Sequence, residues 1–168
     1  MKRFLTFRLS ILALIAVTFF GCEPDHTTIT AVRINKIKIV NYPILTGGSS
    51  WDDPLIGSTS GPDVSWSISG SDNYSSTAYF TDCTGSVLEF TTTNNSSSLP
   101  VFLNDPNGTY TLSIRDVDGL DGSDFASSDD VMAELSFIPF TTGDTGTIYT
   151  ELEDSDLKVQ IEFTYLFE

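Results

Sequence analysis

The sequence LKVQIEFTYLF, residues 157–167, has an apolar side chain at every second position. The residues of this unbroken series are Leu157, Val159, Ile161, Phe163, Tyr165 and Phe167. Successive side chains of a β-strand point to opposite faces, so a period of two places all of these residues on one face. The segment is therefore predicted to be a long β-strand with one face buried in a core.

Earlier segments repeat this alternation in shorter form. Residues 29–42 alternate with one slip of phase near Asn35 and Lys36, which indicates a β-bulge or a break between two strands. Further strands are predicted over residues 64–68, 77–80, 87–92, 110–114, 131–140 and 146–152, with a short apolar piece at 99–103. Turn-forming residues separate these segments, and no helical pattern intervenes. Residues 29–168 are therefore predicted to form one all-β domain, an antiparallel β-sandwich.

The most unusual chemistry lies in residues 110–130, YTLSIRDVDGLDGSDFASSDD. The predicted strand 110–114 leads into a loop whose aspartates are Asp116, Asp118, Asp121, Asp124, Asp129 and Asp130. No cationic side chain follows Arg115 in this loop, so the carboxylates repel one another unless a cation joins them. Carboxylate oxygens are the ligands that calcium prefers. The loop is predicted to bind calcium; the alternative is a solvated acidic surface loop.

Spacing indicates which aspartates can share an ion. Asp116 and Asp118 stand at positions i and i+2 of an extended segment, so their side chains point to the same side and can hold one ion between them. A carboxylate returned by Asp124 or Asp130, together with Asp63 from a neighbouring loop, would complete a shell of about six to eight oxygens. The sequence leaves open which of Asp124, Asp129 and Asp130 contributes.

The first residues of the sequence have the pattern of a secretion signal. Lys2, Arg3 and Arg8 precede an apolar run over residues 9–20, which is too short for a helix crossing a bilayer core of about 30 Å. Residues 1–21 are therefore predicted to be a signal peptide. The end of this segment, FFGC, resembles the lipobox of bacterial lipoproteins, which implies that Cys22 becomes the lipidated, palmitate-bearing first residue. The alternative is an ordinary secretory signal with an incidental cysteine.

Residues 22–28 are predicted to be the lipidated tether between this membrane anchor and the domain. They contain His26, the only histidine of the chain, without a partner for catalysis or metal binding. Acidic residues directly after Cys22 resemble the export signals of some surface lipoproteins, so the expected location is the outer membrane of a bacterial cell envelope.

Charge excludes one class of partner. The formal net charge is −15, and removal of residues 1–21 leaves five basic residues against 23 acidic ones, a net charge near −18. No basic patch can be assembled to meet phosphates, so nucleic acid is excluded. The same charge argues against unaided docking on an anionic bilayer.

Neither the cysteines nor the single histidine indicates an enzyme. Cys83 is the lone thiol once Cys22 is acylated, and it is predicted to be buried and inert. No Ser-His-Asp or Cys-His set can form, and aspartates gathered in one Gly/Ser-rich loop are more typical of metal ligands than of an acid and a base held across a cleft. The chain is expected not to be an enzyme.

The order of segments over residues 34–167 resembles the C2 domain. Residues 37–40, IKIV, lead into an acidic loop and then GPDVSWSI at 61–68, similar to the family's first strand, first calcium loop and the segment after it. Residues 110–118, YTLSIRDVD, are similar to the family's strand that ends in Asp-x-Asp, and DVMAE at 130–134 to its Asp-Phe-Ile-Gly-Glu. The resemblance implies an eight-stranded Greek-key β-sandwich that binds calcium through loops at one tip.

The resemblance also implies roles for single residues. Asp116 and Asp118 match the bridging ligands of the third loop, and Asp130 its final acidic position, with Asp124 as a competitor. Asp63 matches the second acidic position of the first loop, and Asp53 or Asp52 the first. The sequence departs from the family pattern in that Pro62 precedes Asp63, the first and third loops are long, and Ala133 replaces a glycine.

Two functions follow as hypotheses. The first is a lipid-anchored envelope lipoprotein whose C2-like domain binds calcium and acts as a binding module. The resemblance implies a phospholipid ligand, but the scarcity of basic residues favours a protein or a glycan, and Trp51 is either a membrane or sugar contact or a core aromatic. The second is a metal-free structural β-sandwich subunit of an envelope assembly.

Overall fold

The structure is a computed structural model that describes residues 28–48, 51, 61–93, 98–117, 130–140, 147–154 and 156–168. Its strands are β1 (Ile29–Asn41), β2 (Val64–Ser69), β3 (Tyr74–Ser75), β4 (Leu88–Thr91), β5 (Val101–Leu103), β6 (Tyr110–Asp116), β7 (Asp130–Phe137), β8 (Thr147–Asp154) and β9 (Leu157–Phe167). Eight strands were expected, and the described residues form nine, of which β3 spans two residues. Within these residues no helix is long and apolar enough to cross a bilayer.

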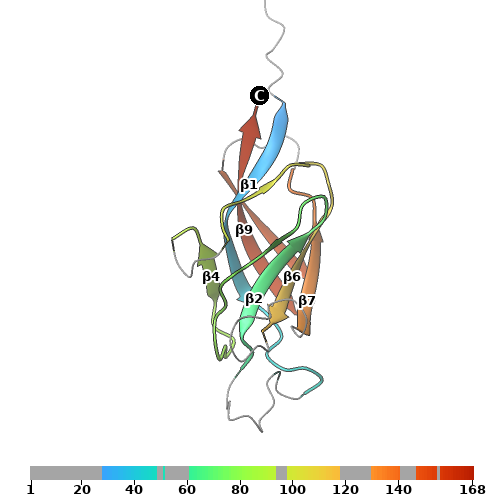
Figure 1. Cartoon of the computed structure of the whole chain (residues 1–168). Helices are drawn as coiled ribbons and strands as arrows, with labels where there is room; N and C mark the ends of the chain where they lie inside the picture. The colour runs from blue at the N-terminus through green and yellow to red at the C-terminus, as the bar shows by residue number, and fades with distance from the viewer. Residues whose placement is uncertain are drawn as a thin grey trace, which may run out of the picture.

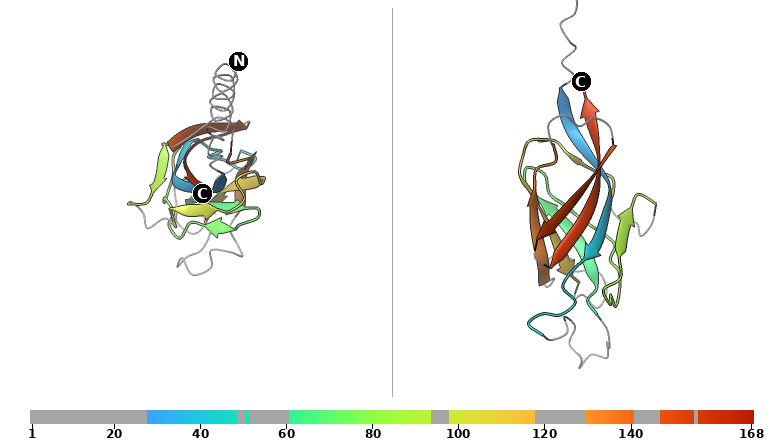
Figure 2. Two further views of the ribbon diagram at one scale, coloured as in Figure 1. Left: turned by 90° about the horizontal axis from the view of Figure 1, so that it is seen from above. Right: turned by 180° about the vertical axis from the view of Figure 1, so that it is seen from behind.

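The strands form two antiparallel sheets that face each other (Figure 1). One sheet has the order β4-β1-β9-β8, with β5 pairing beside β4 on the same edge of β1, and the other has the order β3-β2-β6-β7. Figure 2 shows the two layers from above and from behind. The predicted antiparallel β-sandwich is confirmed.

Strand β1 organises the first sheet. It pairs with β9 along its whole length, from Ile29 opposite Phe167 to Asn41 opposite Lys158. The register shifts between Ile34 and Lys36, where the sequence predicts a bulge or a break. On its other edge, β1 pairs with β5 over residues 32–34 and with β4 over residues 36–39. The bulge therefore lies where β1 passes from one short partner strand to the next.

The core lies between the two sheets and is filled by the alternating residues of these strands. Its largest fully buried side chains include Trp66, Tyr110, Phe90 and Phe163. Burial of a large apolar side chain contributes roughly 1.5–3 kcal/mol, so this layer dominates the stability of the domain. The apolar face of β9 is buried from Leu157 to Tyr165, but Phe167 is 41% exposed, because it lies at the end of the strand beyond the core.

One predicted strand is wrong. Residues 77–80 were expected to form a strand, but the short strand that pairs with β2 is β3, at residues 74–75. The chain then turns at Ser76, whose Oγ accepts a hydrogen bond from the Ala78 amide at 3.1 Å and donates one to the Ala78 carbonyl at 2.7 Å. Phe80 rejoins the sheet through an isolated bridge to Val64. A local side-chain turn therefore replaces the expected ladder.

The strands give the sandwich two distinct ends. At one end, which we call the terminal end, the Glu168 amide donates to the Thr28 carbonyl at 3.1 Å. The opposite end, which we call the acidic end, is where β1, β6 and β8 finish and β2, β7 and β9 begin (Figure 1). With 13 residues, β1 alone spans about 40 Å between the two ends.

Candidate functional site at the acidic end

The sheet register brings three of the predicted ligands to the acidic end. Val64 pairs with Asp116, and Asp116 pairs with Asp130. Asp63, which directly precedes β2, therefore lies beside the last residue of β6, and the first residue of β7 lies on the other side, on strands about 4.8 Å apart. Other predicted positions, namely Cys22, Asp53, Asp118, Asp124 and Asp129, lie outside the described residues.

Asp116 occupies the position that a core residue would otherwise take. Tyr110, Leu112 and Ile114 share its face of β6 and are fully buried, and Asp116 itself is 0% exposed. Its Oδ1 accepts a hydrogen bond of 2.7 Å from the backbone N–H of Asp63. A buried carboxylate is costly unless such donors meet it, so this contact helps to hold Asp116 in the folded state.

Asp63 joins three segments of the chain. Besides donating its amide to Asp116, it accepts the Val117 amide on its backbone carbonyl at 2.9 Å. Its side-chain Oδ1 accepts the amide of Asp82 at 2.8 Å. Burial raises the pKa of Asp63, the hydrogen bond from Asp82 opposes that shift, and the nearby Asp82 charge adds to it. The Asp63 carboxylate therefore lies in surroundings that disfavour its charge.

The segment around Cys83 packs directly against this cluster. The Cys83 amide donates to the Pro62 carbonyl at 2.9 Å, and a Cβ placed on Gly61 would lie 1.6 Å from the Cys83 carbonyl oxygen. Cys83 is a free thiol whose pKa is raised by burial. The prediction that this cysteine is buried is confirmed.

Asp82 also lies at the acidic end, although the sequence analysis did not predict it as a site residue. Its backbone has a φ of 53°, a left-handed conformation that aspartate tolerates better than most residues. The only signal in the sequence is its place in the turn-rich stretch between Thr81 and Gly85. Its contact with Asp63 joins positions 19 residues apart, which local pattern does not reveal.

Carboxylate oxygens at the acidic end are suitable ligands for a hard cation. The described residues, however, contain only some of the predicted ligands. Carboxylate oxygens have capacity beyond one amide contact, about four lone-pair sites per group. Among the described residues, however, no group of three or more histidine, cysteine, aspartate or glutamate side chains is arranged to hold a metal ion. The remaining predicted ligands belong to residues 52–60 and 118–129, outside the described ranges.

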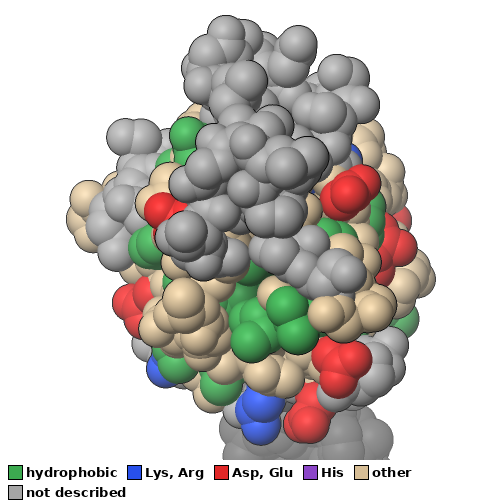
Figure 3. Space-filling model, turned by 90° about the horizontal axis from the view of Figure 1, so that it is seen from below, with side chains coloured by type: hydrophobic (Ala, Val, Ile, Leu, Met, Phe, Trp, Pro, Cys, Tyr) green, Lys and Arg blue, Asp and Glu red, His purple; other side chains and the backbone are tan. Residues whose placement is uncertain are grey.

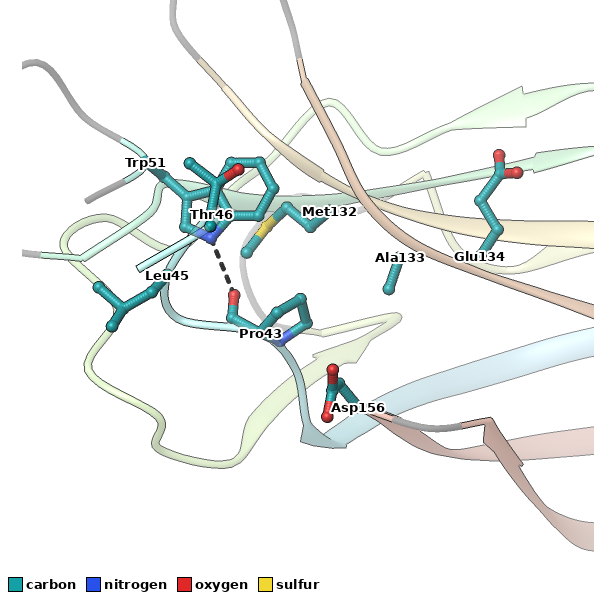
Figure 4. A pocket seen from close by; sticks show the side chains of 9 residues that line it. Pro43, Leu45, Thr46, Trp51, Met132, Ala133, Glu134 and Asp156 are labelled. Atoms are coloured by element: carbon teal, nitrogen blue, oxygen red, sulfur yellow. Dashed lines mark hydrogen bonds between the residues drawn. The ribbon is translucent and has the colours of Figure 1, made fainter. Parts of the chain in front are cut away.

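Beside the acidic end lies a cavity of about 430 Å³, which we call the Trp51 pocket. It is lined by Pro43, Leu45, Thr46, Gly47, Trp51, Met132, Ala133, Glu134 and Asp156. The Trp51 Nε1–H donates to the Pro43 carbonyl at 3.0 Å, with Met132 beside the indole and Asp156 beyond Pro43 (Figure 4). Trp51 is half-buried and packs against the core while it also lines the pocket.

Viewed from the acidic end, hydrophobic side chains gather near the centre of the described surface, and acidic side chains, with some basic ones between them, lie around them (Figure 3). Ile44 and Leu45, in the loop that follows β1, are 44% and 52% exposed. This end therefore combines an apolar surface with negative charge.

No protein-family pattern and no curated protein sequence matches this chain. In fold, the chain is similar to human GIVD cytosolic phospholipase A2 in complex with a methyl gamma-linolenyl fluorophosphonate inhibitor and terbium chloride. That match has 14% identity and a TM-score of 0.51 over 84% of this chain, and it spans 18% of the phospholipase. A C2 domain of plant Extended Synaptotagmin 1 matches with 13% identity and a TM-score of 0.48, over 83% of this chain and 96% of that one.

A further solved C2 domain matches with 13% identity and a TM-score of 0.38 over 83% of this chain and 98% of that one. Identities at this level concern the fold alone. The chain therefore has the fold of an all-β antiparallel sandwich, and the solved structures with a similar fold include C2 domains.

Proposed function

We propose that this protein is a lipid-anchored binding module of a bacterial cell envelope, whose acidic end binds calcium and a partner molecule without catalysis. The observation that carries this proposal is the sheet register, which places the backbones of Asp63, Asp116 and Asp130 on neighbouring segments at one end of the sandwich. The partner that we propose is a protein or a glycan.

Calcium is supported by the chemistry of the donors. Asp63 and Asp116 are already fixed by backbone amides, so less ordering is needed when an ion binds. The proposed ligands Asp53, Asp118 and Asp124 belong to the two loops that flank these residues in the sequence. When bound, calcium would supply positive charge to a chain whose formal net charge is −15. The phospholipase with a similar fold was solved with terbium chloride, and terbium, like calcium, is a hard cation that takes oxygen ligands.

The placement of the two ends supports a partner away from the anchoring membrane. The proposed lipid anchor, Cys22, precedes Thr28 by six residues, and Thr28 lies at the terminal end. The acidic end lies about 40 Å away along β1. After removal of the leader, the only basic residues are Arg33, Lys36, Lys38, Arg115 and Lys158. Geometry and charge together favour a protein or glycan over the phospholipids of the anchoring membrane.

A second candidate function is the metal-free structural subunit of an envelope assembly. One observation favours it: the described carboxylates of Asp63 and Asp116 accept hydrogen bonds from amides of their own chain. In that case the acidic end is a structural junction between β2, β6 and the segment around Cys83, and calcium has no effect on it.

Thermal unfolding with calcium and with chelator distinguishes the two functions. A ligand present at 100 times its Kd stabilises the folded state by about 2.7 kcal/mol, so calcium is expected to raise the melting temperature measurably. Replacement of Asp116→Asn together with Asp118→Asn should abolish that rise. Terbium offers an independent readout, because excitation of Trp51 should sensitise its emission if the ion binds nearby.

The matched control is Glu89→Gln together with Glu162→Gln, which removes the same charge from β4 and β9 in the other sheet. This variant should retain the full effect of calcium. If the melting temperature of the wild-type protein is the same in calcium and in chelator, the metal-free function is supported. The control variant could also lose as much of the calcium-induced rise in melting temperature as the double aspartate variant. Calcium would then act through the overall negative charge of the protein and not through a site at the acidic end.

A further inference from the structure

We propose that the Trp51 pocket binds a lysine or arginine side chain of a partner protein. The inference deepens the proposed function, because it rests on a protein partner at the acidic end, but it does not depend on calcium. It is carried by three features of the described residues: a positioned aromatic wall, hydrophobic residues within a largely polar lining, and ionisable groups of one sign only.

The aromatic wall is held in place by its own hydrogen bond. Because the Trp51 Nε1–H already donates to the Pro43 carbonyl at 3.0 Å, the indole is oriented before any ligand arrives. The half-buried ring keeps part of its surface accessible at the pocket. A cation over an indole face is attracted by the negative potential of the ring. This cation–π attraction favours binding of a basic side chain in the pocket.

Part of the remaining lining suits the stem of a long basic side chain. Most of the exposed surface of the pocket is polar, and its apolar part includes Pro43, Leu45, Met132 and Ala133, from the loop after β1 and from β7. Lysine and arginine bury their methylene groups along such surface while the charged head remains near polar groups. The volume of about 430 Å³ lies in the range of ordinary ligand pockets and leaves room for the backbone that flanks the side chain.

The charge of the pocket selects a cation. The ionisable residues of its lining are Glu134 and Asp156, and none of the lining residues is basic. Glu134 accepts a hydrogen bond from Ser113 Oγ at 2.7 Å and points away from Trp51, whereas Asp156 stands at the rim beyond Pro43 (Figure 4). Asp156 is therefore the charge partner that we assign to the bound side chain. The net charge of −15 also attracts basic partners at longer range.

Nuclear magnetic resonance of the full mature chain, recorded in chelator, tests this proposal. Indole N–H signals report separately on Trp51, in the pocket, and on Trp66, which is fully buried in the core. Titration with a pentalysine peptide is expected to shift the Trp51 signal to saturation and to leave Trp66 unchanged. Pentaglutamate should shift neither signal. A Trp51 signal that does not respond to pentalysine would overturn the proposal, whatever the effect of calcium on stability.

Two variants and a matched control locate the interaction. Asp156→Asn should weaken pentalysine binding about tenfold, a change equivalent to about 1.4 kcal/mol, whereas Glu89→Gln, which removes the same charge from β4, should change it less than about twofold. Trp51→Ala should abolish saturable binding, which is then followed through the Met132 methyl signal. Asn41 Nδ2 donates to the backbone carbonyl of Asp156, a contact that Asp156→Asn keeps.

Equal losses in Asp156→Asn and Glu89→Gln would mean diffuse attraction to an acidic surface and would contradict a site. The same titration with phosphatidylcholine vesicles and with a neutral oligosaccharide tests the other classes of ligand. If either shifts the Trp51 signal to saturation and pentalysine does not, the pocket does not serve a basic protein segment.

Discussion

Asp116 has two properties that normally exclude each other, full burial and a carboxylate group. The hydrogen bond of 2.7 Å from the amide of Asp63 to Oδ1 offsets part of the cost of burying this group. Asparagine at position 116 keeps an acceptor oxygen for that amide, whereas alanine would leave the amide without this acceptor, at a cost of about 1–3 kcal/mol. The Asp116→Asn change is therefore the better probe of charge, because it preserves the structural contact.

Asp63 and Asp72 should affect stability in opposite ways as the pH changes. Burial raises the pKa of Asp63, so the folded state binds its proton more tightly than the unfolded state does. The stability that this provides is fully present below the unfolded pKa, about 4, and is lost as the pH rises through the folded pKa. In chelator, Asp63→Asn is therefore expected to be more stable than the wild-type protein at neutral pH, and this advantage should shrink on acidification.

Asp72 provides the comparison of opposite sign. The Asn104 amide, which donates at 2.7 Å, is the main cause that holds the pKa of Asp72 below its ordinary value. Its contribution is present above the unfolded pKa and is lost as the pH falls through the folded pKa. Asp72→Asn should therefore lose stability at neutral pH and lose less in acid. Urea unfolding of both variants and the wild-type protein between about pH 3 and pH 7 measures the two trends, and parallel trends would contradict the assignment.

For single residues, the sequence predicted which aspartates are candidate ligands, but it did not predict which groups those aspartates contact. Asp63 and Asp116 are recognisable as candidate ligands from their positions beside predicted strands. The hydrogen bond between them joins residues 53 positions apart and exists only after β2 and β6 have paired. The same holds for Asp82, which meets Asp63 through the turn before Cys83.

Among the elements, the strands with a clear apolar pattern were predictable, and the two-residue strand β3 was not. Strand β9 has the bounds that the sequence predicts, because period-two alternation over eleven residues has no other ready explanation. The slip in β1 is also visible in the sequence alone. By contrast, β3 contains only two residues, Tyr74 and Ser75. The sequence predicts a strand at residues 77–80 instead, on composition alone. The hydroxyl of Ser76 determines the local turn instead.

The segment before β2 should be unusually sensitive to substitution. A Cβ on Gly61 would lie 1.6 Å from the Cys83 carbonyl oxygen, and the atoms in the way are backbone, so the chain must move to admit it. Gly61→Ala is expected to destabilise the domain by about 2 kcal/mol or more. Gly47→Ala is the control: its Cβ would meet nothing within 4 Å, and only its φ of 58° adds a cost, about 1–2 kcal/mol. Urea unfolding compares the two, and a smaller loss for Gly61→Ala would contradict the packing described.

For the whole molecule, the alternation of apolar and polar residues predicted the sandwich. It did not predict which segments lie at each end of the sandwich. Alternation and turn residues are local, so they indicate fold class. Which loops share an end depends on how β1, β6 and β7 pair with partners distant in sequence. The separation between Thr28 and the acidic aspartates therefore emerged only from the structure.

Anchoring through Cys22 is a prediction about the whole molecule. Acyl chains contribute about 0.8 kcal/mol for each buried methylene group, so the wild-type protein should sediment with membranes and incorporate an alkyne-tagged palmitate. Cys22→Ser should lose the label and leave the membrane fraction. Cys83→Ser is the control, since Cys83 is a buried core thiol and its replacement should leave labelling unchanged. Equal labelling of wild-type protein and Cys22→Ser would rule out this anchor.

The long pairing of β1 with β9 has a mechanical consequence. When the chain is held at Thr28 and a partner pulls on the acidic end, tension runs parallel to the strands. Extension then requires β1 to slide past β9, β4 and β5, which loads many interstrand hydrogen bonds at the same moment instead of opening them one after another. A domain built in this way resists shear, a property suited to a tether under load.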